Sequence, residues 1–228
     1  MALVLFIILV LIISAVFHEY AHGWVAHKLG DDTAKAAGRL TLNPLAHLDP
    51  IGSVILPLLL VFSHSAFFIA WAKPVPYNPF NLRDRKYGDL KVALAGPLTN
   101  FIIAIIFGLL ARFIPLAYML KQSLAVAFIS GNYDALLNQV QGSFAASVFV
   151  LSLVIVLINL LLMIFNLIPL PPLDGSKVLL TFLPADWKIR FYKIEPYGIF
   201  IILLLFLWLY SLIWTPLLFL FSLLTGVA

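Results

Sequence analysis

The pentapeptide His18-Glu19-Tyr20-Ala21-His22 combines residue types and a spacing that suit metal-dependent hydrolysis. If the segment is helical, His18 and His22 lie on one face with Cβ atoms about 5–6 Å apart, and two imidazoles at that spacing can bind one tetrahedral Zn²⁺. Glu19 is rotated about 100° around the helix from His18. It can therefore approach a water molecule on the metal as a general base without being a ligand.

A catalytic zinc site uses three protein ligands and leaves one position open. The chain has no cysteine, so the third ligand must be His, Asp or Glu. Asp174 is the candidate, because the prolines of Pro169–Pro172 end a helix and let a nearby carboxylate turn back toward the metal. The competing interpretation is that Asp174 only caps a short helix that follows it.

The segment before the pentapeptide is apolar from Ala2 to Phe17 and has neither a basic leader nor a small-residue cleavage site. We therefore expect a retained transmembrane helix over about Leu3–Leu29, not a cleaved signal peptide. Ionisable residues within such a helix are costly and by default functional. The weaker alternative is a structural polar cluster or an interfacial pair of histidines.

The composition is that of a membrane protein, with 63% hydrophobic and 11% charged residues, against about 45–50% and 25% in soluble domains. We expect an all-α polytopic membrane protein with about five to six transmembrane or re-entrant segments, in a single membrane-embedded domain over residues 1–228. Further spans are predicted near 90–114, 143–168 and 197–224, whereas residues 51–71 either span or re-enter. A small extended segment is expected near residues 38–43.

The basic residues predict an orientation. We place the end of the first helix, residues 73–91 and residues 177–193 on the same side of the membrane. All but two of the 14 Lys and Arg residues then lie on that side, and the exceptions are Arg112 and Lys121. Basic loops mark the cytoplasm. We therefore expect a multi-pass protein of the cell membrane, in contact with the lipid bilayer, and we read the net charge of +4 as a topology signal and not as a sign of nucleic-acid binding.

Three motifs taken together resemble the site-2 proteases, which are intramembrane zinc metalloproteases. They are the pentapeptide 18–22, the run Asn166–Gly175 and the Gly-Pro segment Ala95–Asn100. The resemblance covers most of residues 14–180, and the chain leaves no room for the PDZ or CBS domains of larger relatives. It implies a three-helix catalytic core with the active site nearer the cytoplasmic face.

The resemblance also implies roles for individual residues. One Zn²⁺ per chain would be held by His18, His22 and Asp174, with Glu19 as the catalytic base and Asn166 near the reacting carbonyl. The implied activity is that of a zinc metalloendopeptidase, cleaving transmembrane proteins or peptides within or near their membrane segments in regulated intramembrane proteolysis.

A substrate helix has its amides paired internally and must unwind before attack. An edge strand within Gly38–Asn43 is a hypothesis for how the unwound segment is held. One rival function is a metal or proton transporter, which would favour inverted repeats that the sequence lacks. Another is an inactive homologue that binds membrane helices, which the intact Glu19 disfavours.

Four other polar residues receive plainer interpretations. His27 lies nine residues from His18, on the opposite helix face, as an interfacial histidine. His47 and His64 are better read as a turn histidine and a packed histidine than as accessory ligands or gate residues. Asn100 either lines the active-site cavity or bonds to a neighbouring helix.

Overall fold

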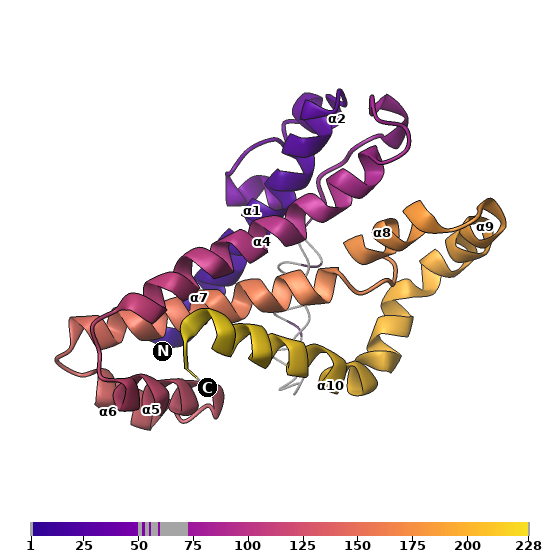
Figure 1. The fold of residues 1–228 in the computed structure, drawn as a ribbon. Helices are drawn as coiled ribbons and strands as arrows, with labels where there is room; N and C mark the ends of the chain where they lie inside the picture. The colour runs from indigo at the N-terminus through magenta and orange to yellow at the C-terminus, as the bar shows by residue number, and fades with distance from the viewer. Residues whose placement is uncertain (1, 50–51, 53–54, 56–58, 60–72, 228) are drawn as a thin grey trace.

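The protein, in a computed structural model, is described over residues 2–49, 52, 55, 59 and 73–227 (Figure 1). Within these residues it is helical and contains no β-strand. Three helices are long and apolar enough to cross a membrane: α1 (Ala2–Lys28), α4 (Gly88–Phe113) and α7 (Phe144–Asn166). The expectation of an all-α membrane protein is thus confirmed. The question of whether residues 51–71 span or re-enter falls almost entirely outside the described residues.

The helices α1, α4 and α7 form the three-helix core. α4 packs against both of the others, and α1 also contacts α7 (Figure 1). The last helix, α10 (Gly198–Thr225), returns along α4 and α7 and consists mostly of apolar residues. Any residue that α1 and α4 carry on their facing sides is therefore enclosed by protein and not exposed to lipid.

The turn that follows α7 positions the start of the next helix. The spanning helix α7 ends at Asn166, and three prolines separate it from α8 (Asp174–Phe182). Proline has no backbone N–H to donate within a helix, so α7 cannot continue into α8. Gly175 makes the close return possible, since a Cβ on it would lie 2.2 Å from the carbonyl oxygen of Leu167. The first turn of α8 thus rests against the end of α7.

Shorter elements complete the chain. α5 (Tyr118–Ile129) and α6 (Tyr133–Val140) connect α4 to α7. The remaining elements, in chain order, are α2 (Thr33–Ala36), η1 (Pro44–His47), η3 (Pro79–Asn81), α9 (Ala185–Ile194) and η4 (Glu195–Tyr197).

The sequence predicted a small extended segment near residues 38–43, and the structure has turns and no β-strand there, so the prediction of a strand was wrong. Gly38 adopts a positive φ of 66° and closes the turn after α2. Asn43 accepts a hydrogen bond from the backbone N–H of Leu45 and so caps η1. Local turn and capping bonds therefore occupy this segment in place of a β-ladder, and an edge strand for substrate does not exist there.

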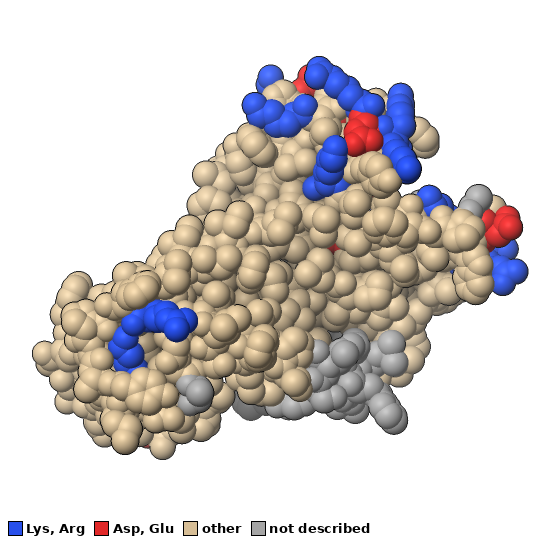
Figure 2. All heavy atoms as spheres, in the orientation of Figure 1, with Lys and Arg blue, Asp and Glu red and all other residues tan. Residues whose placement is uncertain are grey.

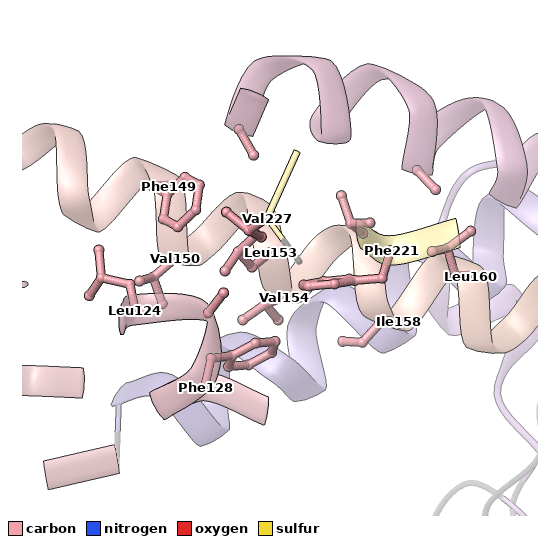
Figure 3. Close-up of a cluster of buried hydrophobic side chains, with 14 of the residues drawn as sticks. Leu124, Phe128, Phe149, Val150, Leu153, Val154, Ile158, Leu160, Phe221 and Val227 are labelled. Atoms are coloured by element: carbon pink, nitrogen blue, oxygen red, sulfur yellow. The ribbon is translucent and has the colours of Figure 1, made fainter. Parts of the chain in front are cut away.

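A hydrophobic cluster holds α5, α7 and α10 together (Figure 3). Leu124 and Phe128 of α5 meet Phe149 and Leu153 of α7, and Phe221 of α10 packs on the same cluster. Phe149, Leu153 and Leu124 are fully buried. Since helices in a membrane associate through packing and hydrogen bonds, this cluster stabilises the contacts of α7 with α5 and α10.

Charged residues gather at the other end. Figure 2 shows Lys and Arg over the end of α1, the start of α4 and the region of α8 and α9, with few elsewhere on this face. The two exceptions lie at the opposite end, where Arg112 donates to the carbonyl of Leu223 and Lys121 donates to the carbonyls of Ala111 and Arg112. The separation of charge inferred from the sequence is present in the fold.

Candidate metal centre

Three ligand atoms from two distant segments form a small buried triangle. The Nε2 atoms of His18 and His22 are 3.0 Å apart, and each lies 3.1 Å from Oδ2 of Asp174. All three residues are buried. Ligand atoms of a tetrahedral zinc site lie about 3.3 Å apart, given bonds of about 2.0–2.1 Å. The triangle therefore has the size and the donor chemistry of a zinc site, with no cluster residue drawn from outside the predicted set.

Each imidazole is held by its other nitrogen. Nδ1 of His18 donates to Oδ1 of Asn100 at 2.6 Å, and Nδ1 of His22 donates to the backbone carbonyl of Val92 at 2.7 Å. A carbonyl oxygen can only accept, so these contacts place the proton on Nδ1 and leave the lone pair on Nε2. Such partners orient metal-binding histidines and fix their tautomer.

Gly96 lets both imidazoles pack closely against α4. A Cβ on this residue would lie 2.4 Å from Nε2 of His22 and 2.5 Å from Nε2 of His18, closer than real Cβ atoms approach their neighbours. The two histidines can therefore keep their positions only because residue 96 has no side chain. This explains why the Gly-Pro segment of the sequence stands opposite the histidines.

Asp174 does not serve as a helix cap. Leu173 occupies the N-cap position of α8, and no side chain caps this helix. The carboxylate instead turns toward the two imidazoles, because Gly175 lets the first turn of α8 press against the end of α7. The structure thus places Asp174 in the cluster with the two histidines and not at the N-cap of α8.

Glu19 lies beside the cluster without joining it. A pocket of about 120 Å³ opens against the three cluster residues, and Glu19 and Asn166 are in its wall; the remaining lining residues are Pro74, Val75, Tyr77, Pro172 and Lys177. Oε2 of Glu19 accepts a hydrogen bond of 2.8 Å from the backbone N–H of Val75. A carboxylate that is near the ion position but is not one of its ligands is what a general base requires.

Asn166 stands at the pocket wall, at the end of α7. Its Nδ2 donates to the carbonyl of Leu162 at 2.9 Å within the same helix. An asparagine amide carries a second N–H, so the side chain can still offer a donor to the pocket.

His47 and His27, two of the histidines with plainer interpretations, lie outside the cluster. His47 is buried, its Nε2 donates to the carbonyl of Thr41, and its own carbonyl accepts from the N–H of Lys73, so it holds a turn. His27 pairs with Asp32 at the end of α1. His64 lies outside the described residues.

Sequence reasoning missed two residues of the site. Asn159 of α7 and Ser14 of α1 extend the contact that Asn100 makes with His18. Asn100 bonds to side chains of both neighbouring helices, which is the second of its two predicted roles, and it is not among the residues that line the pocket. Asn159 could have been identified from the sequence, because it is the one amide in the middle of an apolar span and polar residues at such positions are often functional.

The profile of peptidase family M50 matches residues 6–209, the region that holds the whole cluster. The chain is 35% identical over 207 residues to YwhC of Bacillus subtilis, a candidate zinc metalloprotease by name, covering 90% of this chain and 82% of the relative. Rip2 of Mycolicibacterium smegmatis, also a candidate zinc metalloprotease by name, is 24% identical over 210 residues, or 89% and 69% of the two chains. The zinc metalloprotease MJ0392 of Methanocaldococcus jannaschii is 28% identical over 184 residues, or 81% and 35%. No solved structure matches the chain.

Proposed function

The chain belongs to peptidase family M50, the site-2 protease family, and on that premise we propose that it is an intramembrane zinc metalloendopeptidase of the H-E-x-x-H type. It hydrolyses peptide bonds within or near transmembrane segments of membrane proteins, as in regulated intramembrane proteolysis. The observation that carries the proposal is the buried triangle of His18, His22 and Asp174 with Glu19 beside it, on a helix apolar enough to cross a bilayer.

His18, His22 and Asp174 hold one Zn²⁺ per chain through Nε2, Nε2 and Oδ2. When bound, the ion supplies a Lewis acid and lowers the pKa of a coordinated water to about 7. The size and the donor chemistry of the ligand triangle support this assignment.

Glu19 moves the protons of the reaction. Its carboxylate accepts a proton from the attacking water and later delivers it to the nitrogen of the leaving amine. Oε2 accepts one hydrogen bond from the N–H of Val75, and because a carboxylate can accept several, Glu19 can still accept from the attacking water. Asn166 offers an N–H from Nδ2 to the oxyanion that develops on the scissile carbonyl, a kind of contact whose loss costs about 2.7–4 kcal/mol elsewhere.

The site lies within the membrane but toward one face, which we assign to the cytoplasm of the cell. His22 is six residues from the end of α1 and Gly96 eight residues from the start of α4, so the site lies about 9–12 Å below the helix ends. That end carries most of the basic residues, in line with the positive-inside rule. A transmembrane substrate must unwind to reach it, since its amides are otherwise paired within the helix.

The test compares purified wild type with Glu19→Gln in bound zinc and in cleavage of a synthetic transmembrane substrate. Glu19→Gln should retain zinc and lose cleavage, whereas Asp186→Asn, an exposed acid on α9 that serves as the matched control, should retain both. Equal cleavage by wild type and Glu19→Gln refutes the base assignment. Zinc without cleavage in the wild type favours a transporter or an inactive homologue.

A further inference from the structure

A continuous chain of hydrogen bonds runs from His18 across the three spanning helices. Asn100 of α4 accepts from Nδ1 of His18 at 2.6 Å, and its Nδ2 donates to Oδ1 of Asn159 on α7 at 2.9 Å. Nδ2 of Asn159 in turn donates to Oγ of Ser14, back on α1, at 3.0 Å. The chain thus begins and ends on α1, one turn apart.

All the side chains of this network are removed from solvent and lipid. Asn100 and Asn159 are 0% exposed and Ser14 is 3% exposed. Burying an amide is unfavourable unless its polar atoms find partners. Here the oxygen and the nitrogen of each amide are both hydrogen-bonded. Each nitrogen has a second acceptor as well, the carbonyl of Ser14 for Asn100 and the carbonyl of Ile155 for Asn159.

The direction of every bond follows from the carbonyl of Ile155. A backbone carbonyl only accepts, so the end of Asn159 that faces it must be the NH₂ group, and the oxygen of Asn159 must face Asn100. Asn100 then presents its own NH₂ group to that oxygen and its oxygen to His18. An oxygen can receive only a hydrogen from the imidazole, which places the proton on Nδ1.

We propose that Asn100, Asn159 and Ser14 are positioning residues that fix the tautomer and the ring orientation of His18, so that its Nε2 lone pair faces the ion. This inference rests on the proposed zinc site. His22 does not need such a network, because the backbone carbonyl of Val92 holds it. The orientation of one ligand therefore depends on side chains 59 residues apart in sequence, and that of the other on the backbone.

The experiment measures zinc affinity by competition with a chelator on the purified full-length protein, with thermal unfolding measured in parallel. Asn100→Leu should weaken zinc binding about 10–100-fold, the range seen when outer partners of metal-binding histidines are lost. Asn159→Leu removes a side chain that has no hydrogen bond to His18 among the described residues, and it should weaken zinc binding about 10-fold through the freed amide of Asn100. Asn100→Asp keeps an acceptor toward His18 but loses the donor toward Asn159, so its zinc affinity should lie between those of Asn100→Leu and the wild type.

Ser152→Ala is the matched control, because Ser152 is also buried on α7 and, among the described residues, its hydroxyl donates to the carbonyl of Val148 within its own helix and to no other group. It should leave zinc affinity unchanged. Folded Asn100→Leu and Asn159→Leu proteins with wild-type affinity overturn the positioning role while leaving the zinc site intact. An equal loss in Ser152→Ala also overturns it, since the effect would then reflect general destabilisation. A wild type that binds no zinc instead overturns the proposed function itself.

Discussion

Gly96 allows the two histidines to lie against α4. Replacement by alanine places a methyl group 2.4 Å and 2.5 Å from the two Nε2 atoms, so the imidazoles must move out of their positions in the ligand triangle. We expect Gly96→Ala to reduce bound zinc at least about 10-fold, as for other disturbed ligand shells. Metal analysis of the purified protein measures this. Leu98→Ala, at an exposed position of the same helix, should bind zinc normally.

Asn166 is expected to act on the rate and not on the metal. Removing one oxyanion donor lowers kcat by about 10²–10³-fold in other hydrolases, and Asn166 contacts none of the three ligands in the described hydrogen bonds. Asn166→Ala should therefore retain zinc and show a large loss of kcat with little change in KM. Steady-state kinetics on a transmembrane substrate measure both, and an unchanged kcat argues against the assignment.

The pairing of His18 with His22 could be predicted from the sequence because helix geometry alone brings i and i+4 together. Asp174 lies 156 residues from His18, and only the proline run hinted that its carboxylate turns back. The contribution of Asn159 and Ser14 could not be predicted. A polar residue within an apolar span is noticeable, but its partner depends on how the helices are rotated against one another, which periodicity does not encode.

At the scale of elements, Asp31 joins the end of α1 to the loop that leads into η3. It accepts hydrogen bonds from Thr33, from the N–H of Asn78 and from Nδ2 of Asn81. Burial raises the pKa of Asp31, but the bonds from Thr33, Asn78 and Asn81 lower it more, so its pKa lies below the ordinary 3.8. The carboxylate therefore stabilises the fold above pH about 4, and this contribution is lost as the pH falls through the lowered pKa.

We expect Asp31→Asn to unfold at a lower temperature than wild type at pH 7, since hydrogen bonds to a charged group contribute about 1.5–3 kcal/mol each. The difference should begin to shrink below pH about 4, where the Asp31 carboxyl of the unfolded chain becomes protonated, and should shrink further as the pH falls through the lowered pKa of the folded protein. Thermal unfolding in detergent at pH 7 and at pH 3 measures it. A gap that is as large at pH 3 as at pH 7 contradicts this account, and the exposed Asp186→Asn should show no gap at either pH.

The ends of the long helices could be predicted to within two residues, because each span begins and ends where the apolar run in the sequence begins and ends. The sequence indicated 90–114 and 143–168, and the structure has Gly88–Phe113 and Phe144–Asn166. The segment at 38–43 failed because its outcome depends on local capping by Asn43 and on the turn at Gly38, which compete with extended pairing.

At the scale of the whole molecule, the charge asymmetry in Figure 2 predicts how the protein lies in its membrane. The chain has no cysteine, so single cysteines report topology without background. In intact cells, a membrane-impermeant maleimide should label Asn138→Cys on α6 and should not label Lys86→Cys before α4. Labelling of Lys86→Cys becomes efficient only after lysis. The reverse pattern places the metal cluster near the outer face and contradicts the assigned orientation.

The proposed zinc site requires that one ion bind side chains of α1, the first spanning helix, and of α8, the helix that follows α7. Zinc content per chain, measured on purified wild type, Asp174→Ala and the control Asp186→Ala, tests this most directly. The account predicts about one zinc per chain in the wild type and the control, and a loss of at least about 10-fold in Asp174→Ala, because two imidazoles alone are too few protein ligands for a catalytic zinc site. Zinc retained by Asp174→Ala at the wild-type level would contradict it.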